Sequence, residues 1–218
     1  MSTESQILLA AERLIATQGV HATSLRQISM EASQRNTAAA QYHFKSKQLL
    51  IEAVFDHRRG GIDVRRHQLL TLAQESGRAA DPWHLTEVLV LPLAEQAMRP
   101  GSHYVRFLQR IFEYAGHDVA ALSEIGGLSE AAAVGLLLRE RLPSLSGPRA
   151  HARFRWAGQL IIAGLADLEQ RCTAHDAAHD SVDPDELVLG LIDAVTGLLA
   201  APVSVSLPGR RHGSPGGG

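Results

Sequence analysis

Helix-start signals recur along this chain, and they constrain its fold more than any other feature. Asp81-Pro82 and Asp183-Pro184 each place an N-cap residue before a proline at the first helical position. Glu186 adds the capping-box partner at the second of these sites. No segment alternates convincingly between apolar and polar residues, as a half-buried β-strand would. The sequence therefore predicts an all-α fold.

The caps and the helical spacing of apolar residues together place the individual helices. Gly19 follows the first helix at the position where a left-handed cap is expected. Ser24, with Gln27 three residues later, gives the second helix a capping box. The helix over 47–77 could break at Gly60-Gly61, because glycine is a poor helix former. The predicted helices span 4–18, 25–32, 37–43, 47–77, 82–98, 102–115, 118–125, 127–141, 148–174 and 184–201.

The two short helices over 25–32 and 37–43 are joined by the tight turn "SQRN", which is the layout of a helix-turn-helix. The stretch "NTAAAQYHFKSK" at 36–47 begins the second of them. Its three alanines leave little side-chain bulk, so this helix can approach a large surface closely. The polar and cationic residues that follow suit a nucleic-acid groove. Phe44 is the exception, and we expect it in the core between the first and fourth helices.

Composition and charge are compatible with this interpretation. The chain has 218 residues, of which 45% are apolar and 20% charged, as in a globular protein. Its net charge of −2 does not by itself indicate nucleic-acid binding. The first 60 residues, however, hold seven Lys and Arg against five Asp and Glu, so the N-terminal part is basic and the remainder acidic.

Cellular location is predicted from the cysteine count and from hydropathy. A single cysteine, Cys172, cannot form an intrachain disulfide, and no secretory signal pattern opens the sequence. The most apolar stretch, 187–203, is shorter than the roughly 20 residues that span a bilayer, and it carries Asp193. We therefore expect a cytoplasmic protein without a membrane partner, in which this stretch is a packing helix.

Two stretches, "AAERLIATQGVHATSLRQI" and "YHFKSKQLLIEAV", combine an Ala-rich first helix, a Gly at its end, a Thr/Ser helix start and an aromatic-rich link into Ser-Lys. In these features residues 5–57 resemble the DNA-binding domain of the TetR family of bacterial transcriptional regulators. The chain departs from the family pattern at Gln34 and Arg35, where Gly and a small apolar residue are usual. Lys45 likewise stands where Gly is common and adds a possible phosphate contact.

The resemblance implies a homodimeric transcriptional repressor with a helix-turn-helix domain over 1–48 and an effector-binding and dimerisation domain over 49–202. The N-terminal domains would read a palindromic operator in double-stranded DNA, and a small-molecule effector would release it. An effector wedged among the helices 47–77, 102–115 and 148–174 would act by changing the spacing of the two recognition helices. The Gly- and Pro-rich tail at 203–218 is predicted to be disordered.

Candidate DNA contacts come from the start of the second helix, the third helix and the link after it. Gln41 can pair bidentately with adenine, and Thr37 can meet a thymine methyl group. The remaining residues are expected at phosphates or at the groove wall, although the cap formed by Ser24 needs no DNA. The full set is Thr23, Ser24, Arg26, Asn36, Thr37, Ala38, Gln41, Tyr42, His43, Lys45 and Lys47.

The C-terminal candidates form two groups. Aromatic and arginine residues that could line an effector cavity are Trp83, Phe107, Arg110, Phe112 and Trp156, although aromatic residues at helical spacing are more often plain core. Apolar stripes and glycines that could close a four-helix bundle between two chains are Phe154, Ala157, Ile161, Gly164, Leu168, Leu187, Leu191, Val195 and Leu198.

The residues leave the chemistry of the effector open, as well as the choice between an effector-controlled regulator and other classes of protein. Arg106 and Arg110 could bind an acidic ligand, or they could form a solvated face with Glu113 as partner. The protein could also be a DNA-binding dimer without effector control. Catalysis and a cofactor are not expected, because no nucleophile-base-acid set or phosphate-binding loop is present. His175 and His179 have metal-ligand spacing, but a polar connection is the simpler interpretation, so no metal is predicted.

Overall fold

The computed structural model describes residues 2–32, 39–116, 129–145, 147–173 and 183–202, and its regular structure in these ranges is entirely helical. This confirms the predicted all-α fold. The predicted helix over 118–125 lies outside the described residues. The helices are α1 (Thr3–Gln18), α2 (Leu25–Glu31), α3 (Ala39–Phe44), α4 (Lys47–Glu75), α5 (Pro82–Ala97), α6 (Tyr104–Tyr114), α8 (Ser129–Arg141), α9 (Pro148–Thr173) and α10 (Pro184–Ala200), with short 3₁₀ helices at Arg78–Ala80 and Pro143–Leu145.

The helix ends follow the capping residues of the sequence. Ser24 and Gln27 form the full capping box of α2, and Ser46 accepts a hydrogen bond from the backbone of α4. Asp81 and Asp183 cap α5 and α10. Gly19 has φ 86° and ψ 166°, so it needs glycine's freedom but is not the left-handed cap that was expected.

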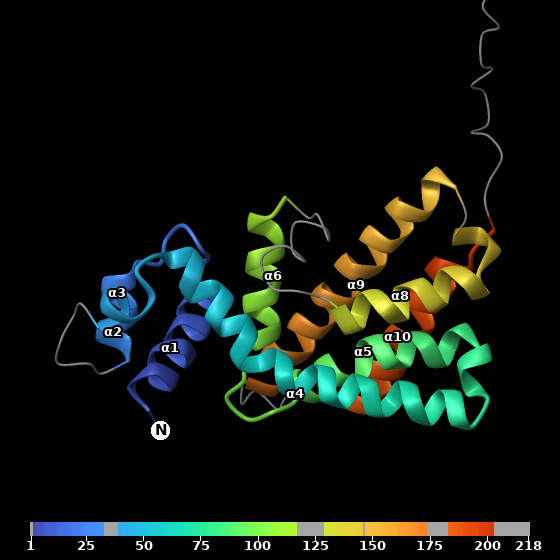
Figure 1. Ribbon diagram of the computed structural model, residues 1–218, viewed down its shortest axis with the longest axis horizontal. Coiled ribbons are helices and arrows are strands. Elements are labelled where there is room, and N and C mark those ends of the chain that lie inside the picture. Colours follow the sequence, from blue (N-terminus) through green and yellow to red (C-terminus); the bar gives the residue numbers. More distant parts are fainter. Residues whose placement is uncertain (1, 33–38, 117–128, 146, 174–182, 203–218) are drawn as a thin grey trace, which may run out of the picture.

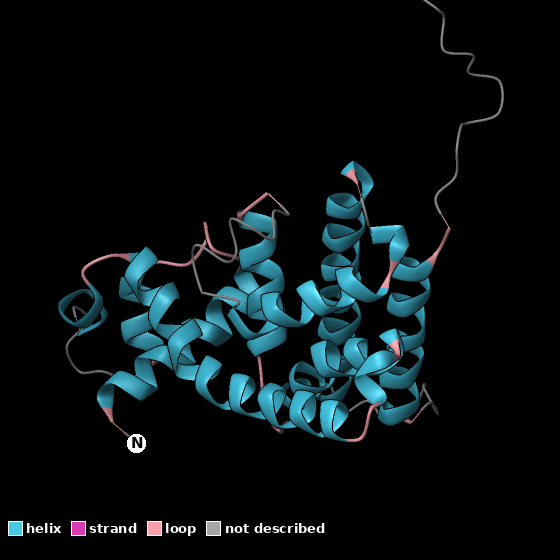
Figure 2. Ribbon diagram, turned by 45° about the vertical axis from the view of Figure 1, so that its right-hand side comes forward, coloured by secondary structure: helices cyan, strands magenta, loops and turns pink. Residues whose placement is uncertain are grey.

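Helix α4 joins the two ends of the molecule. It starts beside α1–α3 and continues, without a break at Gly60-Gly61, along α5 (Figure 1). After a 45° turn, the N-terminal helices still lie at one end of the molecule, and the other helices lie beyond them (Figure 2). One helix therefore belongs both to the N-terminal group and to the body.

The hydrophobic core does not stop where α1–α3 end. The cluster that contains Ile7, Ile28 and Phe44 continues along α4 to Ile62 and includes the buried face of α6. A second cluster fills the space between α5, α8, α9 and α10. The boundary near residue 48 stays a prediction, and the N-terminal helices share their core with α4 and α6.

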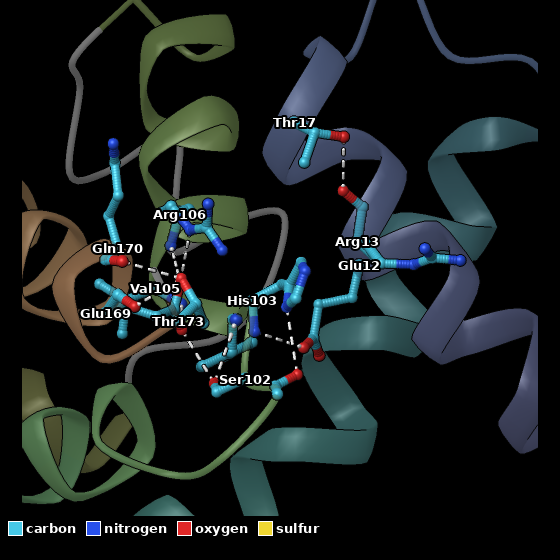
Figure 3. A network of polar contacts seen from close by, with 12 residues as sticks. Glu12, Arg13, Thr17, Ser102, His103, Val105, Arg106, Glu169, Gln170 and Thr173 are labelled. Atoms are coloured by element: carbon cyan, nitrogen blue, oxygen red, sulfur yellow. Dashed lines mark hydrogen bonds and ion pairs between the residues drawn. The ribbon is translucent and has the colours of Figure 1, made fainter. Parts of the chain in front are cut away.

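Two buried carboxylates hold the N-terminal end of α6 (Figure 3). Glu169 of α9 accepts hydrogen bonds from the backbone N–H groups of Val105 and Arg106, at 3.0 Å each, and from Ser102 Oγ at 2.8 Å. Glu12 of α1 accepts from the backbone N–H of His103 at 3.4 Å. The first N–H groups of a helix have no partner inside the helix and carry partial positive charge, so buried carboxylates stabilise them.

Arg58 of α4 also takes part in the contacts at the N-terminal end of α6. Its Nε and Nη2 donate to the two carboxylate oxygens of Glu12 at 2.7 and 2.9 Å, a bidentate ion pair. Its guanidinium carbon also lies 5.9 Å from the ring centre of Tyr104, at the start of α6. Helices α1, α4 and α6 therefore meet through one charged contact.

Replacing Glu169 by alanine should lower the free energy of unfolding by about 3 kcal/mol, because it leaves buried N–H groups of α6 and the Arg106 guanidinium without their acceptor. The matched control is Asp167→Ala, which removes an exposed carboxylate of the same helix that pairs with Arg171. That change should cost less than about 1 kcal/mol. Urea unfolding of both variants measures the difference, and equal losses would contradict the assigned role of Glu169.

Candidate functional site

A buried serine fixes α2 against α3. Ser29 Oγ donates to the Leu25 carbonyl at 3.1 Å and accepts from the backbone N–H of Ala40 at 2.9 Å. The side chain of Phe44, at the end of α3, lies in the hydrophobic core as predicted. Ile28 is fully buried in the same cluster. The role of Ser29 was not predicted, because a small polar residue between two apolar residues is all that marks this position in the sequence. This bond sets the position of α3 on the scaffold.

The outer surface of α2 and α3 is polar and cationic. Arg26, Gln41, His43 and Lys45 are exposed, and Tyr42 is 82% exposed, although an apolar core lies directly beneath it. Nearby acids are already paired, since Glu31 binds Arg13 and Asp56 binds Arg59. The described part of this face therefore presents positive charge and hydrogen-bond donors, which is what a phosphate backbone attracts.

Several residues predicted to touch DNA have partners within the chain. Thr23 is only 1% exposed, and its Oγ1 donates to the Gly19 carbonyl at 2.8 Å, so a side-chain phosphate contact does not fit its position. Gln41 Nε2 donates to the Lys45 carbonyl at 2.9 Å, and Lys47 Nζ donates to the Val20 carbonyl at 2.8 Å. Both of these side chains keep further donors, but each also supports the local fold.

The other predicted DNA contacts are a capping residue, three positions outside the described residues and four exposed side chains. Ser24 is engaged with Gln27 in the capping box. Asn36, Thr37 and Ala38 lie outside the described residues. Of the predicted set, Arg26, Tyr42, His43 and Lys45 are therefore the most open side chains in the described ranges.

A cavity of about 510 Å³ lies among α4, α6 and α9, the three helices expected to hold an effector, with α5 and α8 completing its wall. This volume is within the range of small-molecule sites. Most of the lining is apolar, and it includes Phe55, Ile62, Leu89, Leu93, Tyr104, Leu108, Phe112, Leu136, Phe154, Ala157, Ile161 and Ile162.

Charged residues also line the cavity, chiefly on α4. Arg66 is 4% exposed, and its Nη1 donates to Asp63 Oδ1 at 2.9 Å. Burial raises the pKa of Asp63 even though Arg66 opposes the shift, and burial lowers the pKa of Arg66. Arg59, Arg139 and Arg155 lie in the same wall.

Of the five predicted effector residues, Phe112 lines this cavity and the other four are placed elsewhere. Phe107 is fully buried against Phe55 and Tyr104. The indole Nε1 of Trp83 donates to Asp193 Oδ1 at 2.6 Å and joins α5 to α10.

The remaining two lie at the surface. Arg110 forms an ion pair with Glu113, and Trp156 is about half exposed on the outside of α9. Arg106, the other arginine considered for an acidic ligand, contacts buried Glu169 through Nε at 3.3 Å. Helical spacing predicted the buried face of α6 but not which buried residues border empty space.

The predicted dimer residues pack mainly within the chain. Ala157, Ile161, Leu168 and Val195 are buried in the second core cluster, so they are not free to contact a second copy. Phe154, Leu187, Leu191 and Leu198 are partly buried against the same cluster. A Cβ on Gly164 would lie 3.0 Å from Leu191, so this glycine serves the contact between α9 and α10 of one chain. The wide stripe of α10 is explained by its neighbours α5 and α9 in the same chain.

Comparison with known proteins agrees with this geometry. Residues 7–54 match the family profile described as bacterial regulatory proteins, tetR family. The N-terminal domain belongs to the TetR family. The match covers α1 to α3 and the first part of α4, which are the elements that build the cationic face. A search of curated proteins found no match to the sequence.

Several solved structures are similar to this chain over most of its length. An HlyIIR mutant protein superposes with a TM-score of 0.52 at 19% identity, covering 90% of this chain and 98% of that one. NalD of Pseudomonas aeruginosa, described as the secondary repressor of the MexAB-OprM multidrug efflux pump, gives 0.47 at 20% identity over 88% and 94%. A TetR-family regulator of Mesorhizobium loti gives 0.46 at 17% over 91% and 95%. At this identity the HlyIIR likeness establishes the shared fold alone.

The described helices were also compared with the requirements of a membrane span and of a metal site. None of the described helices has the length and apolar character needed to cross a bilayer. Across the described ranges, no three His, Cys, Asp or Glu side chains group closely enough to hold a metal ion. His175 and His179 lie outside those ranges.

Lys45 is the departure from the TetR-family pattern with a direct structural consequence. It has φ +55°, a left-handed conformation that is costly for a residue with a side chain. Lys45→Gly should raise the free energy of unfolding by about 1 kcal/mol. The same change removes a cation from the face formed by α2 and α3, so if this face binds DNA, the salt dependence of DNA binding should fall by about one charge.

Urea unfolding and DNA titrations at several salt concentrations measure these opposite effects. Lys45→Asn is the matched variant, because asparagine tolerates the left-handed region and is uncharged. A loss of stability in the glycine variant would contradict the strain at this position, and an unchanged salt slope would place Lys45 away from the phosphates.

Proposed function

We propose that this protein is a transcriptional repressor that binds a palindromic operator as a homodimer in the cytoplasm and is released by a small molecule. The observation that carries the proposal is that α4 and α6 both line the cavity and both contact α1 of the DNA-binding domain. A ligand that moves either helix would therefore change the position of the cationic face. No catalytic role is proposed.

For DNA binding, α3 is the recognition element. Buried Ala40 faces the scaffold, and Tyr42, His43 and Lys45 project from the other side or the following turn. A short helix held by Ser29 and Phe44 suits insertion in the major groove, with phosphate contacts from its flanks. Arg26 of α2 supplies a cation on the opposite flank.

For release, the shortest connection runs through Tyr104. Tyr104 lines the cavity, Arg58 lies over its ring, and Arg58 holds Glu12 of α1. A ligand that binds one arrangement of α4 and α6 more tightly shifts the population toward that arrangement. Operator DNA must then weaken ligand binding by the same factor by which ligand weakens DNA binding. A DNA-binding dimer without effector control is less well supported, because a pocket of about 510 Å³, the size of a small-molecule site, borders helices that contact α1.

For dimerisation, we propose the outer faces of α9 and α10. Trp156 and Leu189 are exposed there. A Cβ added to Gly190 or Gly197 would meet nothing within 4 Å, so packing within the chain does not require these glycines. Each costs about 1 kcal/mol relative to alanine in a helix, and close approach of a second copy would explain their presence.

The proposal is tested by selecting genomic fragments that the purified protein retains at moderate salt and by footprinting the fragments. A protected palindrome with two half-sites in successive major grooves is the expected result. Retention without sequence preference would contradict operator recognition. Release of the footprint by a compound that binds the protein alone would then test effector control.

Tyr42→Ala should weaken binding to the footprinted site by about tenfold or more, because one phosphate or groove contact is worth about 1–3 kcal/mol. The change should leave the unfolding midpoint within error, since Tyr42 is 82% exposed. Leu72→Ala is the control, because Leu72 is an exposed large side chain near the C-terminal end of α4, away from α1–α3. Fluorescence anisotropy compares the variants, and equal DNA affinities would exclude α3 as the recognition element.

Leu189→Arg should convert the dimer to a monomer at micromolar concentration, because it places two unpaired charges in the proposed contact. Val64→Arg is the control, since Val64 is an equally exposed apolar residue on α4, away from α9 and α10. Light scattering measures the mass of both. A wild-type monomer, or a Leu189→Arg dimer, would contradict this interface.

A further inference from the structure

The cavity holds a buried guanidinium whose hydrogen-bonding capacity is not filled. Arg66 has five N–H donors, and Asp63 accepts one of them at 2.9 Å. Its Nε is buried and has no hydrogen-bond partner in the described part of the chain. A buried polar group without a partner costs about 1–3 kcal/mol, so an acceptor that enters this cavity is stabilised there.

The charges around Arg66 also favour an anion. Four arginines and one aspartate line the cavity. Arg59 is paired with Asp56, and Glu130 lies close enough to influence both Asp63 and Arg66. Arg139 and Arg155 form no ion pair within the described ranges, and both are exposed at the cavity's edge. Positive charge therefore remains after the nearby acids are counted.

The rest of the wall is mostly apolar, and its large side chains come chiefly from three helices. Phe55 and Ile62 on α4, Phe112 on α6 and Phe154 on α9 all border the cavity. Such a surface excludes water and binds hydrocarbon, at about 25 cal/mol for each Å² buried. A ligand for the whole site must therefore combine a hydrocarbon body with an acceptor of hydrogen bonds from arginine.

We propose that the cavity binds an amphipathic carboxylate, whose hydrocarbon chain lies against the apolar wall and whose carboxylate accepts hydrogen bonds from Arg66. Arginine and carboxylate match in geometry and charge, and the low dielectric of the cavity strengthens their contact. This inference rests on the proposed effector function and specifies the chemical class of the effector.

Three probes with the same chain and different head groups test the proposal: decanoate, decanol and decylamine. Calorimetric titration of the full chain without DNA, below the aggregation concentration of each probe, should give the tightest binding for decanoate. Arg66→Met should weaken decanoate binding by about tenfold or more, as expected for a hydrogen bond to a charged group. The same variant should change decanol binding little.

Two further variants keep the test decisive. Asp63→Asn removes the one acid of the lining and should tighten decanoate binding, so it tests the charge even if Arg66→Met fails to fold. Arg110→Met removes an arginine outside the cavity and should leave all three affinities unchanged. Circular dichroism checks that each variant is folded.

The outcomes separate the ligand class from the switch. Equal or tighter binding of decanol or decylamine, or no binding of any probe, overturns the carboxylate proposal. Decanoate binding that depends on Arg66 supports it, whether or not DNA is released. A separate anisotropy titration of the DNA complex with decanoate then tests effector-controlled release. If decanoate binds but does not release DNA, effector control is contradicted and the assignment of the ligand class is not.

Discussion

The N-terminal end of α6 is the point on which the rest of the structure depends. Its unpaired N–H groups need acceptors, and two buried carboxylates from different parts of the chain supply them. Glu12 comes from α1, inside the DNA-binding domain, and Glu169 comes from α9, inside the body. Since neither carboxylate has much contact with water, each is stable only in this arrangement. The electrostatics of one helix end therefore joins the two parts of the molecule.

The cavity borders this N-terminal end of α6. Tyr104 is both the first residue of α6 and part of the cavity wall, and Arg58 and Glu12 follow it toward α1. Packed cores have discrete arrangements and do not deform continuously, so a bound molecule can favour one of them. In the proposed mechanism, these few residues would couple ligand binding to the orientation of α3.

Sequence reasoning succeeded where the controlling interaction is local. The capping box of Ser24 and the caps of Asp81 and Asp183 depend on residues two or three positions apart, and all are present. The predictions were less accurate where contacts between distant segments determine whether a side chain is buried or which partner it has. Val195 looked available for a partner, but α5 and α9 of the same chain cover it. Arg66 was not identified, because nothing in the sequence indicates that one turn of α4 borders a cavity. Glu169 and Ser29 were missed for the same reason, since their partners come from other helices.

The uninterrupted course of α4 has a mechanical consequence. Gly60 and Gly61 are exposed, and a Cβ on either would meet nothing within 4 Å. They lie between Arg58, which forms an ion pair with Glu12 of α1, and Ile62, which borders the cavity. Glycine adds backbone freedom, and paired small residues are where helices bend. If the protein acts as the proposed dimer, bending of α4 at this pair would change the separation of the two recognition helices, and DNA and ligand would each favour a different separation.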